Sequence, residues 1–224
     1  MKPVWARSNP RMTLLYRIVL FLAYCFFKLL YRHRVYGHEH FYAGAALIAA
    51  NHVSFYDPPL LSLSWPQEVH FLARRSLFKN PLFGWLIRNL NTHPLSGGAS
   101  NAGVFKAVLQ LLSHGNKVVL FPEGKRSFTG ELQAFKPGFS LLVARSHTAV
   151  IPAYIHGSFS IWGRGRAFPK LWGKTACVFG TPLLWSDLMH LGSEKGQAEL
   201  SRRLAAAIEA LRKWYEEGAR GTPP

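Results

Sequence analysis

The pattern of hydrophobic and polar positions divides the chain into one long apolar segment followed by alternating short elements. Residues from about 12 to 31 are rich in Leu, Phe, Ile and Tyr, which predicts a helix. After Gly37, short apolar runs bounded by turn residues alternate with segments of helical periodicity. Such alternation is typical of an α/β layer fold, so we expect a mixed sheet flanked by helices.

The apolar runs predict five strands and several helices in the part of the chain after Gly37. The strands are expected at 45–50, 69–73, 117–121, 150–155 and 175–179, and the helices at 58–63, 83–90, 101–113 and 138–145. A last helix from about 193 to 217 is predicted to be amphipathic, with Leu200, Leu204, Ile208, Leu211 and Tyr215 on one face. We divide the 224 residues into an N-terminal membrane-anchoring helix at 1–34 and one globular domain at 35–224.

The N-terminal segment combines apolar residues with a strong excess of positive charge. The chain carries 27 Lys and Arg against 11 Asp and Glu, and no acidic residue precedes Glu39. Basic residues flank the apolar run, which suits an anionic lipid surface better than a nucleic-acid groove. A nucleic-acid-binding protein remains a minor alternative, because the chain has no basic-aromatic repeat or recognition element.

The length of the apolar segment leaves its position in the membrane open. Its longest charge-free part, 18–27, has about ten residues, whereas a span needs roughly twenty. Snorkelling of Arg17 and Lys28 would bring it to a marginal spanning length. We favour a helix embedded in one leaflet, with a single span or a core helix as alternatives. Two cysteines without a disulfide pattern, and no signal-peptide cleavage site, favour the cytoplasmic face of the cell membrane.

The sequence NHVSFYD at 51–57 directly follows the predicted strand at 45–50. Open α/β sheets bind ligands at the carboxyl ends of their strands, and His52 and Asp57 can form a histidine–carboxylate pair there. The carboxylate would set the ring tautomer and leave the other ring nitrogen as a base. The alternative is structural, since Asp57 before Pro58 also fits the start of a helix. Ser54 is a weak nucleophile candidate, because no G-x-S-x-G elbow surrounds it.

The sequence FPEGKRS at 121–127 follows another predicted strand. Gly124 allows a tight turn, and Lys125 and Arg126 supply donors for a phosphate. Glu123 could hold Arg126 or a substrate hydroxyl. A solvated, charged turn is an equally good interpretation of this segment alone.

Together these segments resemble the phosphate-acyltransferase family that includes bacterial 1-acyl-glycerol-3-phosphate acyltransferase. That family carries N-H-x-x-x-x-D and F-P-E-G-[TS]-R-S motifs, with an intermediate block that resembles 73–88 and a proline-broken strand that resembles 150–154. The resemblance covers about 35–184 in order. It implies the mixed sheet of the glycerolphosphate-acyltransferase fold for the domain at 35–224.

The resemblance also implies roles for the site residues. His52 would deprotonate the acceptor hydroxyl, Asp57 would orient His52, and Glu123, Gly124, Lys125 and Arg126 would lie in the acceptor-binding segment. The acyl donor would be acyl-CoA or acyl carrier protein, and the acceptor a lysophospholipid, with 1-acyl-glycerol-3-phosphate as the best single choice. No cofactor and no metal is implied, and we interpret His33, His38 and His40 as interfacial or loop residues.

Two departures from the family pattern limit the choice of acceptor. Lys125 stands where the family has Thr or Ser. The region 92–100, where the family has a basic residue for the acceptor phosphate, contains no Lys or Arg. Lys79, Arg126 or Lys136 would then compensate, or the acceptor is another lysolipid or an aminolipid. A non-catalytic lipid-binding protein of the same fold is a further alternative.

Overall fold

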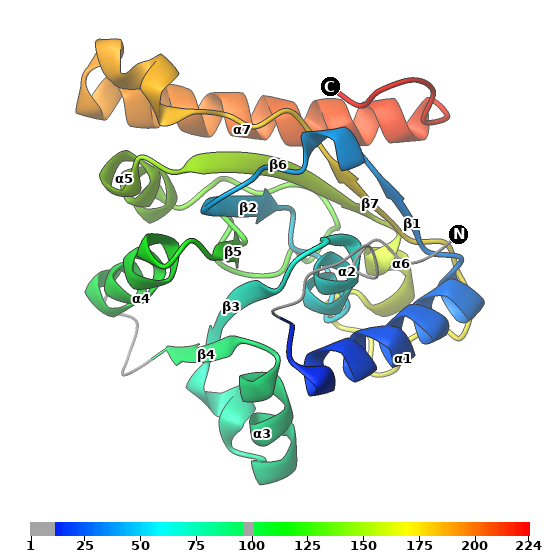
Figure 1. Cartoon of the computed structure of the whole chain (residues 1–224). Coiled ribbons are helices and arrows are strands. Elements are labelled where there is room, and N and C mark those ends of the chain that lie inside the picture. The colour runs from blue at the N-terminus through cyan, green and yellow to red at the C-terminus, as the bar shows by residue number, and fades with distance from the viewer. Residues whose placement is uncertain (1–11, 96–100) are drawn as a thin grey trace.

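A computed structural model describes residues 12–95 and 101–224 and shows a seven-stranded sheet with helices on both faces (Figure 1). The strands are β1 (Arg34–Tyr36), β2 (Ala46–Ala50), β3 (Val69–Arg74), β4 (Thr92–Leu95), β5 (Lys117–Leu120), β6 (Ala149–His156) and β7 (Ala176–Phe179). The helices are α1 (Leu14–Tyr31), α2 (Asp57–Ser64), α3 (Pro81–Asn89), α4 (Asn101–Ser113), α5 (Pro137–Ser146), α6 (Ser158–Trp162) and α7 (Ser193–Glu216). Short 3₁₀ turns are η2 (His38–His40), η3 (Arg75–Phe78) and η4 (Trp185–Leu191).

The strand order places several chain connections at one edge of the sheet. The order is β1-β7-β6-β2-β5-β3-β4, and the strands from β6 to β4 all run parallel to one another. Strand β7 is antiparallel to β6, and β1 is parallel to β7. Because parallel strands end at the same edge, the segments that follow β6, β2, β5, β3 and β4 meet there.

Side chains of β2 alternate between two hydrophobic cores, one on each face of the sheet. Ala46, Ile48 and Ala50 pack with α1 and α2. Leu47 and Ala49 pack with α4, α5 and α7. A strand that is buried on both faces has apolar side chains at successive positions, because neither face contacts water. The sequence ALIAA of β2 fits this rule. Figure 1 shows the sheet between these two groups of helices.

The predicted mixed sheet flanked by helices is confirmed, and the predicted strands and helices are present with ends that differ by no more than two residues. The pattern missed β1, β4 and α6. Strands β1 and β4 are the two edges of the sheet, and their residues are partly buried or exposed, so neither contains an apolar run. Strand β4 also contains Pro94, which an edge strand tolerates because its free side needs no backbone donor.

Helix α1 packs lengthwise on the domain and leaves one apolar face exposed. Tyr16, Leu20, Phe27 and Tyr31 are buried in the core shared with α2 and the sheet. The opposite face exposes a row of apolar side chains that includes Leu14, Ile18, Leu22 and Leu29. Among the described residues, α1 is the one helix whose length and composition would allow it to cross a membrane. The division of the chain at residue 34 stays a prediction.

The buried face of α7 allows a direct test of the fold. Leu204 on this helix is completely buried against the sheet, and Lys195 on the same helix is exposed. We expect Leu204→Ala to lower the free energy of unfolding by about 2–5 kcal/mol, because it removes buried methyl groups and leaves a cavity. Lys195→Ala should change it by no more than about 0.5 kcal/mol. Equal midpoints for both variants in denaturant unfolding, followed by circular dichroism, would contradict this packing.

Candidate functional site

The loop between β2 and α2 brings His52 and Asp57 into contact. Their side chains lie 2.8 Å apart, from Nδ1 of the imidazole to Oδ2 of the carboxylate. The Asp57 side chain is completely buried, whereas 18% of the His52 side chain is exposed. The pair therefore has one member inside the protein and one at the surface, as a base needs in order to reach a substrate.

Asp57 receives hydrogen bonds from four groups in two separate segments. Its Oδ2 also accepts from the backbone N–H groups of Val53 and Ser54, each at 2.7 Å, and its Oδ1 accepts from Ser158 Oγ at 2.7 Å. Four converging donors suit an ionised carboxylate, which can only accept. The residue that caps α2 is Tyr56, and the carboxylate of Asp57 binds the loop and α6 rather than the amides of α2. Helix capping therefore does not account for Asp57.

The His52 ring is held flat against a neighbouring aromatic residue. It stacks on Phe121 with a centroid distance of 3.9 Å and an interplanar angle of 15°. A hydrogen bond from Nδ1–H to the carboxylate leaves Nε2 with a free lone pair. In the part of the chain that the structure describes, no residue hydrogen-bonds to Nε2. The arrangement presents one basic nitrogen toward the surface.

Glu123 joins the FPEGKRS segment to the histidine loop through the backbone. Its Oε1 accepts from His52 N at 2.7 Å, its Oε2 accepts from Gln133 N at 3.0 Å, and the side chain is 1% exposed. Burial raises the pKa of this carboxyl group. A further bond runs from Ser127 N to the carbonyl of His52 at 2.8 Å. Glu123 thus holds backbone groups in place, and it forms no hydrogen bond or ion pair with Arg126 among the described residues. Contact of Glu123 with a substrate hydroxyl stays a prediction.

Gly124 forms the tight turn that the sequence predicted. Its φ of +70° lies in the left-handed region, and its N–H donates to the carbonyl of Phe121 at 2.9 Å. A Cβ at this position would approach the Lys136 side chain to 3.2 Å. Lys125 follows the turn and is exposed. Lys136, one of the cations considered as a compensating residue, therefore passes beside this turn.

Arg126 lies among other cations without a carboxylate partner. Its guanidinium carbon is 3.5 Å above the centre of the Phe55 ring, and its Nη1 is buried without a hydrogen-bond acceptor among the described residues. Arg164 donates to the carbonyl of Arg126 at 3.1 Å and stacks over Phe128 at 3.6 Å. Burial lowers the pKa of Arg126, the nearby charges of Arg164 and Arg74 lower it further, and the charge of Asp57 partly opposes them. Such a cluster attracts an anion with several oxygen atoms, such as a phosphate.

Three residues at this edge were missed by the sequence analysis. Ser158 follows β6, Arg74 ends β3, and Arg164 follows α6. Ser158 comes just after an apolar strand, as His52 does, so the same rule would have predicted it as a site residue. Nothing local distinguishes Arg74 or Arg164 from other surface arginines.

Two other interpretations of the polar residues are not supported by their contacts. Ser54 is buried and donates to the carbonyl of Trp162 at 2.8 Å, so its hydroxyl is not paired with His52. His33 is also buried, between Thr175 Oγ1 and Ser64 Oγ at 2.9 Å each. Burial lowers its pKa to about 3. His33 thus lies in the loop between α1 and β1, as expected, but it is buried there and connects α2 to the chain before β7.

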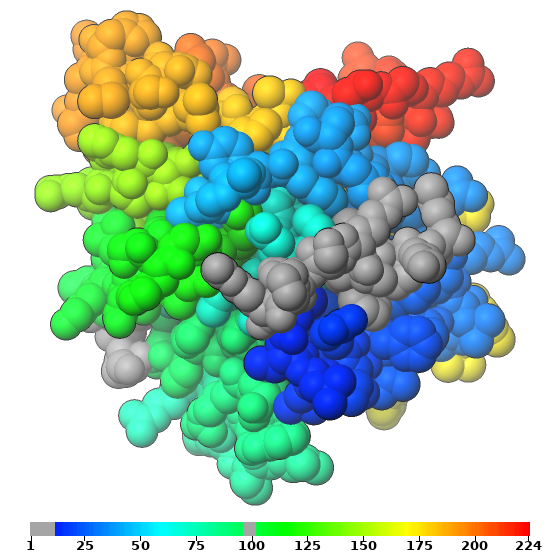
Figure 2. Space-filling model, viewed as in Figure 1, coloured from blue at the N-terminus to red at the C-terminus, as the bar shows by residue number. Residues whose placement is uncertain are grey.

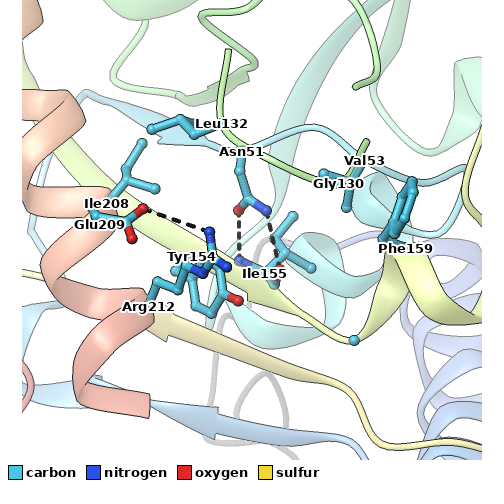
Figure 3. Close-up of a pocket in the computed structure, with 11 residues that line it drawn as sticks. Asn51, Val53, Gly130, Leu132, Tyr154, Ile155, Phe159, Ile208, Glu209 and Arg212 are labelled. Carbon is cyan, nitrogen blue, oxygen red and sulfur yellow. Dashed lines mark hydrogen bonds and ion pairs between the residues drawn. The ribbon is translucent and has the colours of Figure 1, made fainter. Parts of the chain in front are cut away.

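A small cavity lies behind the histidine loop, between β6 and α7 (Figure 3). Asn51 beside it exchanges two hydrogen bonds with the backbone of Ile155, at 3.1 and 2.8 Å, which ties the end of β2 to β6. The cavity measures about 80 Å³, and His52 is not among its lining residues. Ligand pockets usually hold about 300–1,000 Å³, so this cavity is not the site of the acyl chain.

Comparisons with known proteins give the same family from sequence and from structure. The family model described as Acyltransferase matches residues 32–156, which is more than half of the chain. The 1-acyl-sn-glycerol-3-phosphate acyltransferase of Bacillus subtilis strain 168 is 28% identical over 186 residues, covering 82% of this chain and 86% of the relative. The chloroplastic 1-acyl-sn-glycerol-3-phosphate acyltransferase LPAT1 of Arabidopsis thaliana is 33% identical over 122 residues, covering 54% of this chain and 34% of the relative.

A solved structure has the same fold over nearly the whole chain. The crystal structure of the 1-acyl-sn-glycerophosphate acyltransferase PlsC from Thermotoga maritima superposes with a TM-score of 0.71 at 25% identity, covering 92% of this chain and 83% of that one. The histidine and FPEGKRS segments both fall within the residues matched by the family model. The family model matches more than half of the chain, and a solved acyltransferase has the same fold. This chain therefore belongs to the Acyltransferase family and is an acyltransferase.

Proposed function

We propose that this acyltransferase moves a fatty acyl group from acyl-CoA or acyl carrier protein to the free hydroxyl of 1-acyl-glycerol-3-phosphate, giving phosphatidic acid. The observation that carries the proposal is the His52–Asp57 pair with a free Nε2 at the sheet edge that also holds the arginine cluster. The names of the relatives from Bacillus subtilis and Arabidopsis thaliana support the same acceptor.

In the proposed reaction His52 acts as the general base. Nε2 takes the proton of the acceptor hydroxyl, and the oxygen attacks the carbonyl carbon of the thioester. The carbon–sulfur bond then breaks, and the departing thiolate takes the proton back from His52. Asp57 orients the ring and stabilises its protonated form during the reaction, while Glu123 keeps the backbone of His52 in position. The proposal needs no metal ion or other cofactor.

The arginine cluster supports a phosphorylated acceptor. Strand β4, where the family has a basic residue nearby, contributes no Lys or Arg in the described residues 92–95. Arg74 and Arg164 lie close enough to affect the ionisation of Arg126, and we assign them the missing positive charge. Of the cations considered for this role, Arg126 is thus kept, and Arg74 and Arg164 take the place proposed for Lys79 or Lys136. A different lysolipid with a phosphate head group would use the same cluster.

The exposed apolar face of α1 supports contact with a membrane, and we place the protein at the cytoplasmic face because its two cysteines form no disulfide pattern. Because the other face of α1 is built into the core, we favour a helix that lies in one leaflet over one that spans the bilayer. Phe27 of α1 also contacts Tyr56 in the histidine loop, with ring centres 5.0 Å apart. A lipid acceptor in the same leaflet would then lie next to the site.

Replacing the base tests the reaction. We expect His52→Ala to lower kcat/KM by about 10²–10⁴-fold, because no other group would remove the hydroxyl proton. The measurement is release of free CoA thiol from acyl-CoA in detergent, with and without lysophosphatidic acid. The control His114→Ala changes an exposed histidine in the turn that follows α4 and should keep normal rates. A folded His52→Ala protein with full turnover would exclude His52 as the base.

Ser158 is expected to act as a positioning residue through Asp57. We expect Ser158→Ala to lower kcat roughly tenfold with little change in KM, because it removes a donor that holds the carboxylate but does not touch the acceptor site. The control is Ser160→Ala on the same short helix, whose hydroxyl bonds only the carbonyl of Gly157. If KM rises and kcat is unchanged, Ser158 serves substrate binding instead.

An acceptor screen tests the identity of the substrate. With one labelled acyl donor, lysophosphatidic acid should be used in preference to lysophosphatidylcholine and monoacylglycerol. Arg126→Gln and Arg164→Gln should each raise the KM for lysophosphatidic acid roughly tenfold or more, because each removes a charged donor to phosphate. Arg145→Gln, an exposed arginine on α5, is the matched control. Unchanged KM values in both variants would remove the cluster from the acceptor site.

A further inference from the structure

The segment between α6 and β7, residues 163–174, carries three large apolar side chains that face solvent. Phe168, Leu171 and Trp172 are exposed by 81%, 65% and 71% of their surface. Single exposed apolar residues are ordinary on protein surfaces, but three within five positions form a patch. A patch of this kind calls for an apolar environment outside the described chain.

The same segment is strongly basic. It contains Arg164, Arg166, Lys170 and Lys174, and the sequence has no acidic residue between Glu131 and Asp187. Arg166 and Lys170 line an open hollow of about 520 Å³ together with Phe159 and Ser160. Within the described residues, Arg166, Lys170 and Lys174 form no salt bridge. Their charge is therefore available to an anionic partner.

Backbone hydrogen bonds fix this segment to the end of α1. Thr175 N donates to the carbonyl of Tyr31 at 2.9 Å, Gly173 N donates to that of Leu30 at 3.3 Å, and the Tyr31 hydroxyl donates to the carbonyl of Lys170 at 2.8 Å. Leu29 on α1, next to these contacts, is 80% exposed. Figure 1 shows the segment, in yellow, beside α1, and in Figure 2 parts of it emerge at the edge of α1. The exposed segment is thus attached to the end of the helix whose apolar face is also exposed.

We propose that residues 163–174 form a second membrane-contact element that binds an anionic phospholipid surface. Phe168, Leu171 and Trp172 insert into the boundary between head groups and acyl chains, where aromatic side chains are favoured. Arg166, Lys170 and Lys174 contact the lipid phosphates. A membrane fits better than an acidic protein, because the segment is hydrogen-bonded to the end of α1, which exposes an apolar face of its own. The inference rests on the membrane location proposed for α1 and adds a second membrane contact about 130 residues further along the chain.

Both proposed membrane contacts pack on the histidine loop. Phe27 of α1 packs on Tyr56, and Trp162, the last residue of α6 before the basic segment, packs on Phe55 with ring centres 4.8 Å apart. The backbone carbonyl of Trp162 also accepts a hydrogen bond from the Ser54 hydroxyl. Binding at both contacts would hold the loop of His52 at the lipid surface, where a membrane-borne acceptor is found.

Vesicle binding tests the proposal with the full-length protein. The fraction that sediments with phosphatidylcholine–phosphatidylglycerol vesicles is compared for the native chain, for Phe168→Ser/Trp172→Ser and for Arg166→Gln/Lys170→Gln/Lys174→Gln. Each set should weaken binding roughly tenfold or more. On pure phosphatidylcholine vesicles, only the aromatic set should have an effect. Thiol release with detergent-dissolved substrate should stay normal for both sets, which shows that they fold and separates this inference from the proposed reaction.

A charge-matched control and a spectroscopic measurement complete the design. Lys195→Gln/Arg145→Gln/Lys213→Gln removes the same charge from exposed positions on α5 and α7 and should bind like the native chain. Brominated lipids should quench a fluorescence component that is lost in Trp172→Phe. The proposal is overturned if the loop variants bind anionic vesicles as the native chain does. It is also overturned if the control loses binding equally, or if Trp172 is not quenched.

Discussion

The buried carboxylate of Asp57 is the group on which the arrangement of the site depends. An ionised carboxylate without partners would be costly inside the protein, and here four donors from the histidine loop and α6 offset that cost. Those donors include the backbone of Val53 and Ser54, so the carboxylate also dictates the path of the loop. The position of the His52 ring is therefore fixed by the buried hydrogen bonds of Asp57.

A second buried carboxylate, Glu123, connects this loop to the segment after β5. Strands β2 and β5 are neighbours in the sheet, and their carboxyl ends bring residues 71 positions apart into direct contact. Because Glu123 binds backbone amides of His52 and Gln133, it fixes the position of His52 relative to the FPEGKRS segment. The parallel sheet thus brings the His52 loop close to the segment after β5, and the two buried carboxylates fix the exact positions of these segments.

The two elements proposed to contact a membrane pack on the same loop. Phe27 of α1 contacts Tyr56, and the carbonyl of Trp162 at the end of α6 accepts from Ser54. Elements that expose apolar and basic side chains therefore pack directly on the segment that carries His52. Under the proposed function this arrangement would link lipid binding to the positioning of His52, because both involve the same few contacts.

The sequence by itself determined the layer architecture and the histidine–carboxylate pair. Apolar runs such as 46–50 and the five-residue spacing of His52 and Asp57 involve residues close together in the sequence. They can therefore be recognised without knowledge of the fold. Only the tertiary structure decided the rest. Ser158 reaches Asp57 across 101 positions, and Arg164 reaches Arg126 across 38, because the strand order brings their loops to one edge. The backbone role of Glu123 and the exposure of Trp172 likewise depend on which surfaces the packing covers, and no pattern along the chain encodes that.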